Sequence, residues 1–313
     1  MSITSNFAAS AKAAYKSLFV HQLGGALLAG LIGANPTLAE EAPKNAGQSH
    51  FKSNLSIGMP GSKGHALGKP VGACIVDMWD TTISKSDERL EMERRATVAA
   101  LKSDAFGRAL KGVKHGQIAM NMAFWHRTQA SITGGWVLVD QNSRFDLADK
   151  VASAPRNGSG YTHTHEAVLF TLKELETCQS ERPIIDIVTD GKTNISGFCA
   201  DPYDCFEAIP FMKKARLEAS FRGATINVLA AEIGSSIGLD EYAKRFMATP
   251  DYRGQESEGL HYRTQAVPGK VFHINGDDFS DPSAWEAKFT EMRRRKLIEE
   301  MTSVSDKRLE NRG

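Results

Sequence analysis

The chain has 313 residues, of which 41% are hydrophobic, 24% are charged and 8% are aromatic. These proportions are those of an ordinary globular protein, and they exclude a collagen, a coiled coil, a disordered chain and a disulfide knot. The 38 basic and 37 acidic residues leave a formal charge of +1, which is too small to attract phosphate backbones over a whole surface, so we do not expect nucleic-acid binding.

Residues 1–39 have the features of an export signal peptide. Lys12 and Lys16 precede a short apolar stretch that ends at Ile32, and small residues near Ala39 suit a cleavage site. The stretch is shorter than the roughly 20 apolar residues of a membrane-spanning helix. We therefore expect cleavage and no transmembrane span afterwards, with an uncleaved N-terminal anchor as the alternative. Residues 40–69 are rich in Gly, Ser, Lys, Asn and Pro, which predicts a flexible leader.

Apolar runs and amphipathic segments alternate over residues 70–302. We predict strands at 71–79, 117–125, 132–139, 183–189, 224–232 and 270–275. We predict helices at 86–102, 145–152, 165–177, 206–221, 239–247 and 282–301. A few polar residues separate the second and third strands, which indicates an antiparallel pair, whereas the other strands are joined through helices and should be parallel.

This alternation predicts a single α/β domain at 70–302, followed by a polar tail at 303–313. The sheet should be doubly wound and mostly parallel, with one antiparallel edge strand and helices on both faces. In such a sheet the ligand site lies beyond the carboxyl ends of the strands, near the point where the strand order reverses. Functional side chains should therefore occur in the loops that follow strands.

The cysteines predict a disulfide, because an exported chain reaches an oxidising compartment. Cys199 and Cys205 bracket a polar loop and are the favoured pair. Cys178 follows a predicted helix and competes for either of them, whereas Cys74 lies in an apolar strand and is expected to be a buried thiol. Zinc is the rival interpretation, but no two cysteines have the close spacing of a zinc motif.

Oxygen-bearing side chains end the first predicted strand. Asp80, Thr82 and Ser84 alternate in an extended loop, so one carboxylate and two hydroxyls can face one hard cation. The alternative is a helix cap, in which Ser84 or Ser86 accepts from the first N–H groups of the next helix. Two other loops at the same predicted edge of the sheet add Thr162 and Asp190.

The three loops together resemble the von Willebrand factor A domain, a Rossmann-like fold with a metal-ion-dependent adhesion site. That pattern has Asp-x-Ser-x-Ser, a distant Thr and a later Asp, which correspond here to Asp80, Thr82, Ser84, Thr162 and Asp190. Segments 80–101, 114–125, 160–162 and 184–191 are more closely similar to a family of exported bacterial A-like proteins of unknown function. The resemblance covers residues 70–300.

The resemblance implies a periplasmic or secreted binding domain without enzymatic activity. It would hold a divalent cation, Mg²⁺ first and Mn²⁺ or Ca²⁺ otherwise, and capture a carboxylate of a protein partner. Two departures from the family pattern put the site in doubt, because Thr82 replaces a Ser and Ile83 replaces a small residue. A degenerate site on a metal-free scaffold is therefore one alternative.

A metal-dependent hydrolase of the phosphatase type is the other alternative. It needs a general base, for which His163, His165 and Asp77 are the candidates. The two histidines could also shift the ion preference toward Mn²⁺ or Zn²⁺, although we expect both to face solvent at a helix start. We interpret the basic run at 293–296 as a solvated helix face, with docking onto an acidic partner or a lipid surface as the alternative.

Overall fold

The computed structural model describes residues 65–66, 68–126, 129–156, 160–194, 205–231, 238–251, 266–275 and 280–302. The chain divides into two units, Met1–Lys52 and Ser53–Gly313, and every described residue belongs to the second. The predicted signal peptide at 1–39 and the polar tail at 303–313 lie outside the described residues. Within the described part, no helix is both long enough and apolar enough to cross a membrane.

The predicted doubly wound, mostly parallel sheet is confirmed. Its parallel strands are β3 (Cys74–Asp80), β4 (Ile118–Trp125), β7 (Pro183–Thr189), β8 (Thr225–Ala231) and β9 (Val271–Ile274). The order across the sheet is β5-β4-β3-β7-β8-β9. Because β4 and β7 lie on opposite sides of β3, the strand order reverses at β3.

The antiparallel edge consists of two short strands rather than the single strand predicted at 132–139. Strands β5 (Gln129–Ser131) and β6 (Val137–Val139) both pair antiparallel with β4. Between them Gly134 and Gly135 have φ values of 74° and 112°, a backbone conformation that glycine adopts readily. The two glycines turn the chain inside the predicted range, so only its last part is a strand, β6, and β5 lies before that range.

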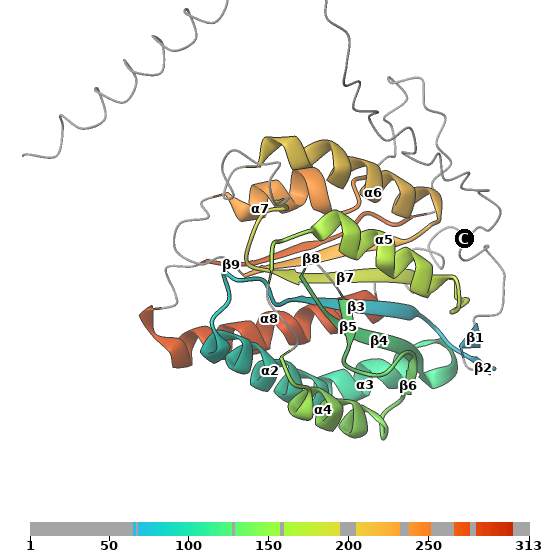
Figure 1. Ribbon diagram of the computed structural model, residues 1–313. Helices are drawn as coiled ribbons and strands as arrows, with labels where there is room; N and C mark the ends of the chain where they lie inside the picture. The colour runs from blue at the N-terminus through green and yellow to red at the C-terminus, as the bar shows by residue number, and fades with distance from the viewer. Residues whose placement is uncertain are drawn as a thin grey trace, which may run out of the picture. The chain divides into compact units, whose positions relative to one another are not determined.

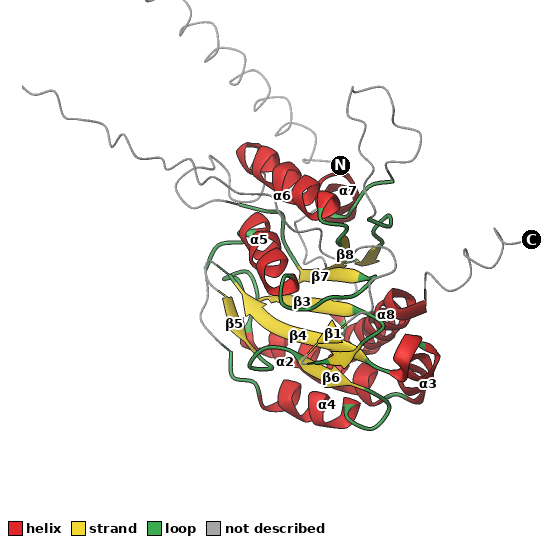
Figure 2. Cartoon of the chain, turned by 90° about the vertical axis from the view of Figure 1, so that its right-hand side faces the viewer, coloured by secondary structure: helices red, strands yellow, loops and turns green. Residues whose placement is uncertain are grey.

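Helices cover both faces of the sheet (Figures 1 and 2). One face is covered by α2 (Asp87–Lys102), α3 (Asp104–Gly112), α4 (Arg144–Ser153) and α8 (Pro282–Thr302). The other is covered by α5 (Thr164–Leu175), α6 (Ile209–Phe221) and α7 (Leu239–Tyr242). The short helical turns are η1 (Lys114–Gly116), η2 (Phe206–Ala208) and the π-helical η3 (Ala243–Met247). At the predicted boundary between leader and domain, β1 (His65–Ala66) and β2 (Lys69–Pro70) form a small antiparallel pair.

The central strand β3 is buried along its whole length because helices lie on both sides of it. Ile75 and Trp79 belong to the core beneath α2 and α8, whereas Val76 and Met78 belong to the core beneath α5 and α6. Alternate side chains of a strand point to opposite faces, so a strand covered on both faces reads as a continuous apolar run. This explains why the strand was recognisable in the sequence.

Helix α3 was missing from the prediction. Ser103 has extended backbone angles and separates α3 from α2, and its hydroxyl accepts from Phe106 N at 3.2 Å as the N-cap of α3. Gly107 lies inside the helix, which weakens the helical signal of the sequence. A Cβ atom at Gly107 would lie 3.0 Å from Arg144 Cζ, so the glycine allows α4 to approach closely.

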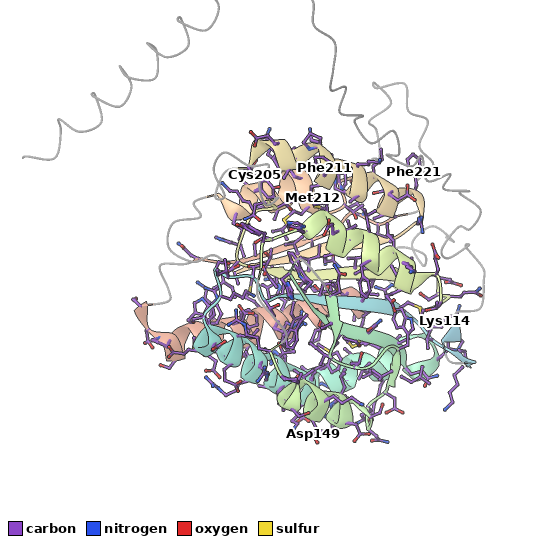
Figure 3. The ribbon with its side chains drawn as sticks, viewed as in Figure 1. Lys114, Asp149, Cys205, Phe211, Met212 and Phe221 are labelled. Carbon is purple, nitrogen blue, oxygen red and sulfur yellow. A yellow bond between two sulfur atoms is a disulfide. The ribbon has the colours of Figure 1, made fainter. Side chains whose placement is uncertain are left out.

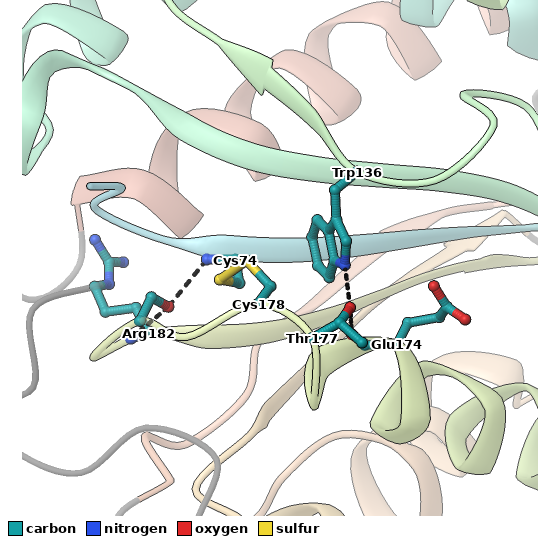
Figure 4. Close-up of a disulfide and its surroundings, with 7 residues drawn as sticks. Cys74, Trp136, Glu174, Thr177, Cys178 and Arg182 are labelled. Carbon is teal, nitrogen blue, oxygen red and sulfur yellow. Dashed lines mark hydrogen bonds between the residues drawn. A yellow bond between two sulfur atoms is a disulfide. The ribbon is translucent and has the colours of Figure 1, made fainter. Parts of the chain in front are cut away.

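A disulfide joins Cys74 to Cys178, so the expectation that Cys74 is a free buried thiol is wrong. The bond connects the first residue of β3 to the chain just after α5, and both cysteines are fully buried (Figure 4). The backbone N–H of Cys74 also donates to Arg182 O at 3.1 Å. Cys205 is disulfide-bonded as well, but its predicted partner Cys199 lies outside the described residues.

Candidate metal centre

The three predicted loops meet at one end of the sheet. They follow β3, precede α5 and follow β7, and β3 and β7 are neighbouring parallel strands whose carboxyl ends share one edge. Backbone bonds tie the loops together: Ile83 N donates to Gly160 O at 3.0 Å, and Asn194 N donates to Thr162 O at 2.8 Å. The site therefore lies where the strand order reverses, as expected for a doubly wound sheet.

Three of the five predicted ligands are in direct contact. The hydroxyl oxygens of Thr82 and Ser84 are 2.9 Å apart, and Ser84 Oγ donates to Asp190 Oδ1 at 3.0 Å. Asp190 and Thr82 are buried, whereas Ser84 is exposed, so the cluster meets solvent on the side of Ser84. Oxygens from the loops after β3 and after β7 thus face one another.

Asp80 lies beneath this cluster and is held by two donors. Its Oδ1 accepts from Thr82 N at 2.8 Å, and its Oδ2 accepts from Thr189 Oγ1 at 2.6 Å. The sequence reasoning missed Thr189, although its place at the end of β7, next to Asp190, was a usable signal. Thr189 orients the Asp80 carboxylate from the neighbouring strand.

Thr162, the fifth predicted ligand, is brought to the site by Asn194. Thr162 N donates to Asn194 Oδ1 at 2.9 Å, and the return bond from Asn194 N completes a two-bond bridge between the loops. A Cβ atom at Gly191 would lie 3.6 Å from Thr162 Oγ1, so this hydroxyl lies against the loop that carries Asp190. Asn194 is a second bridging residue that the sequence reasoning did not identify.

Ser86, not Ser84, caps helix α2. Ser86 Oγ accepts from Arg89 N at 3.2 Å, and Asp87 and Glu88 occupy the first turn. The N-cap alternative for Ser84 is therefore wrong, because Ser84 bonds to Thr82 and Asp190 instead. Its hydroxyl belongs to the oxygen cluster.

The electrostatics of the site favour a cation. Burial, together with the neighbouring Asp80 carboxylate, raises the pKa of Asp190 to about 7, although Lys85 and Arg89 act in the opposite direction. Lys85 Nζ pairs with Glu93 at 2.7 Å, and Arg89 Nε pairs with Glu93 at 3.2 Å. The positive charges of these two side chains are therefore shared between Glu93 and the Asp80–Asp190 pair. Two buried carboxylates without a cation therefore repel each other, and a bound cation would relieve this repulsion.

The spacing of the oxygens fits a small divalent ion. With bonds of about 2.0–2.1 Å in an octahedron, neighbouring oxygens around Mg²⁺ lie about 2.9 Å apart. The observed O···O separations are 2.9 and 3.0 Å, which are also hydrogen-bond distances that hold the oxygens together without an ion. Among the described residues, no group of three or more His, Cys, Asp or Glu side chains is placed to hold a metal. The five candidate ligands are two carboxylates and three hydroxyls.

The two histidines after Thr162 are buried, so the expectation that both face solvent is wrong. They are 7% and 8% exposed, and their rings stack with centroids 5.9 Å apart. His163 Nδ1 lies 3.0 Å from Glu166 Oε2, and the ring of His165 contacts Phe211. Burial lowers the pKa of His165, which favours the neutral ring.

Asp77, the third candidate base, faces away from the candidate centre. It accepts from Trp79 Nε1 at 3.1 Å and pairs with Arg293 of α8, on the opposite side of the sheet from α5. Arg293 also bonds to Asp186 at 3.1 Å. Asp77 is therefore part of a buried ionic network, and its place in the hydrolase alternative is wrong.

This network also corrects the interpretation of the basic run at 293–296 as a solvated face. Arg293 and Lys296 are fully buried, whereas Arg294 and Arg295 point toward solvent. Lys296 contacts Asp186 and lies 3.2 Å from Glu300. Burial raises the pKa of Glu300, although the nearby cations of α8 oppose this shift. The helix is thus joined to the central strands by charged side chains.

Comparisons with known proteins identify one family and several solved structures to which the chain is similar. Residues 75–305 match the model of a family described as proteins of unknown function (DUF1194), whereas no curated protein matches. Similar solved structures include the PilB minor pilin from Streptococcus sanguinis, with 12% identity over 74% of this chain and 63% of that chain and a TM-score of 0.47. The von Willebrand factor type A structure from Catenulispora acidiphila has 13% identity over 73% of this chain and 43% of that chain, with a TM-score of 0.43.

Another similar structure is proximal thread matrix protein 1 from the mussel byssus with a zinc-occupied MIDAS motif. It has 12% identity over 72% of this chain and 47% of that chain, with a TM-score of 0.41. The chain spans less than two thirds of the length of each of these three structures.

Proposed function

Because the chain belongs to the DUF1194 family and has a von Willebrand factor A-like fold, we propose that it is a metal-dependent binding domain. Asp80, Thr82, Ser84, Thr162 and Asp190 would hold one divalent cation. When bound, the ion supplies a coordination position on the exposed side of Ser84 that a carboxylate of a protein partner can fill. The role proposed is binding and not catalysis.

The observation that carries this proposal is the contact between the loops after β3 and β7. Ser84 Oγ lies within 3.0 Å of both Thr82 Oγ1 and Asp190 Oδ1, which is the spacing of neighbouring oxygens around a small octahedral ion. Ca²⁺ takes six to eight oxygens at about 2.3–2.6 Å in a more flexible geometry. We propose Mg²⁺ first, or Mn²⁺ of similar size, because all five candidate ligands are oxygens.

We propose that the domain works outside the cytoplasm, in the periplasm or after secretion. The support is the buried Cys74–Cys178 disulfide, since such bonds persist in oxidising compartments and are rare in the cytosol. Lys12 and Lys16, followed by a short apolar stretch, support the same assignment from the sequence.

Thermal unfolding tests the metal centre. The protein is treated with EDTA and then titrated with Mg²⁺, Mn²⁺ and Ca²⁺, alongside an Asp190→Asn variant. An ion at 100 times its dissociation constant stabilises the folded state by about 2.7 kcal/mol, which raises the melting temperature by several degrees. We expect this shift with Mg²⁺ and Mn²⁺ in the wild type and its loss in the variant, because an amide oxygen carries no charge.

Asp149→Asn is the matched control, since Asp149 is an exposed carboxylate on α4, away from the carboxyl ends of the strands (Figure 3). This variant should shift like the wild type. If no ion shifts the wild type, the metal-dependent function is wrong and a metal-free scaffold is the better description. If Asp190→Asn shifts as much as the wild type, Asp190 is not a ligand.

A further inference from the structure

Two exposed apolar side chains flank the candidate metal centre. Ile83 lies between Thr82 and Ser84 and is 78% exposed, the highest value among the large hydrophobic side chains of the described residues. Tyr161 immediately precedes Thr162 and is 44% exposed. The bond from Ile83 N to Gly160 O joins their loops, so the two side chains lie beside the oxygen cluster on adjacent segments.

Single exposed apolar residues are common on protein surfaces, so exposure alone does not indicate a site. The position of this pair distinguishes it from other exposed residues. Each residue is adjacent in the sequence to a proposed ligand, and a hydrogen bond joins the two loops. The backbone that fixes the oxygens therefore also fixes Ile83 and Tyr161. We name the pair Ile83 and Tyr161 the apolar rim.

Among the described residues, Arg156 and Glu166 are two charged side chains beside these loops that are paired within the chain. Arg156 pairs with Asp87 and donates to Lys85 O at 3.0 Å, which holds the loop after β3. His163 faces Glu166. A partner that binds the cation at the centre also meets the apolar rim, and burial of the rim would add to recognition.

We infer that the preferred partner is an extended protein segment in which Asp or Glu has an aliphatic or aromatic residue two positions away. This inference rests on the proposed function, since the carboxylate must fill the open position of the bound ion. In an extended segment, residues two apart point to the same side at a spacing of about 6.6 Å. The acidic side chain then reaches the centre while its apolar neighbour packs against Ile83 and Tyr161.

The test is selection from a random peptide library displayed on phage. The full chain is immobilised in Mg²⁺, and bound phage are eluted with EDTA and sequenced. We expect enrichment of an acidic residue with an aliphatic or aromatic residue two positions away. One enriched peptide is then synthesised and its affinity measured by fluorescence polarisation for the wild type and for the double variant Ile83→Ser, Tyr161→Ser.

The double variant should bind the peptide at least about tenfold more weakly, since burial of apolar surface is lost, while its thermal shift with Mg²⁺ is retained. The matched control is Phe221→Ser. Phe221 is 50% exposed but lies at the end of α6, close to where β8 begins and thus at the opposite edge of the sheet (Figure 3). This variant should bind like the wild type.

The outcomes separate the rim from the metal centre. Acidic peptides without an apolar neighbour, or equal binding by the double variant, would overturn the inference and leave the proposed function intact. The absence of EDTA-eluted peptides, with a retained Mg²⁺ thermal shift, would overturn the inference and carboxylate capture but not metal binding. The absence of a thermal shift as well would overturn all three.

Discussion

Removal of the Cys74–Cys178 disulfide should strongly destabilise the domain. The two cysteines are 104 positions apart, and cross-linking a loop of about 100 residues stabilises a protein by about 4.7 kcal/mol in the chain-entropy treatment. Measured values for native disulfides are about 2–5 kcal/mol. A Cys74→Ala, Cys178→Ala double variant should therefore lose an amount in this range, chiefly because its unfolded chain regains conformational freedom.

Urea unfolding at equilibrium measures this loss. The midpoint should fall, and the m-value should rise, because an unfolded chain without the cross-link exposes more surface. In a thermal scan the melting temperature should fall by about 5–15 °C for a domain of this size. A loss below about 1 kcal/mol would refute the reasoning, since the unfolded chain would then be equally restricted without the bond.

A Cys205→Ala variant provides the comparison. With its predicted partner Cys199, six positions away in the sequence, Cys205 would close a short loop whose entropic contribution is only roughly 2 kcal/mol. The long-loop variant should therefore be the less stable of the two. The reverse order would contradict either the entropic argument or the predicted pairing of Cys205.

Three further predictions concern the candidate centre, the buried network and close backbone packing. Burial raises the pKa of Asp190 from 3.8 to about 7, so between these pH values the folded metal-free protein binds a proton that the unfolded chain releases. The free energy of unfolding in EDTA should therefore fall as pH rises from about 4 to 7. Urea titrations should show this slope in the wild type and its loss in Asp190→Asn. Arg293→Met leaves two buried carboxylates without their guanidinium and should cost about 3–5 kcal/mol in urea unfolding, whereas the partly exposed Arg294→Met should change stability by less than about 0.5 kcal/mol. Gly269→Ala would place a Cβ atom 1.9 Å from a backbone oxygen and should lower stability by about 1–3 kcal/mol. Gly112→Ala, where a Cβ atom would meet no atom within 4 Å, should instead raise the melting temperature slightly. Equal effects of the two substitutions would contradict the packing argument.

The sequence alone determined the fold class and the composition of the candidate centre. Strands buried on both faces read as continuous apolar runs, and the helices between them require parallel crossovers. Once the strands are parallel, their carboxyl ends share one edge, so Asp80 and Asp190 were expected to meet although 110 positions separate them. That inference needed only chain order and the two-residue period of strands.

Tertiary structure decided which side chains pair. Cys74 in an apolar strand reads as a buried thiol, and only the docking of α5 brings Cys178 to it. Likewise the basic run on α8 reads as a solvated face, because a buried cation is stable only beside buried carboxylates. Those carboxylates, Asp77 and Asp186, lie on neighbouring strands that are far from α8 in the sequence.

The same distinction holds at the candidate centre. The alternation of Thr82 and Ser84 predicted that their hydroxyls face one way, because this depends on local backbone geometry. The bridges made by Thr189 and Asn194 depend on how the loops from β3, α5 and β7 approach one another, and no local pattern specifies that. Local periodicity therefore determined the residues that could bind a cation, whereas long-range packing decided which of them lie within 3.0 Å of one another.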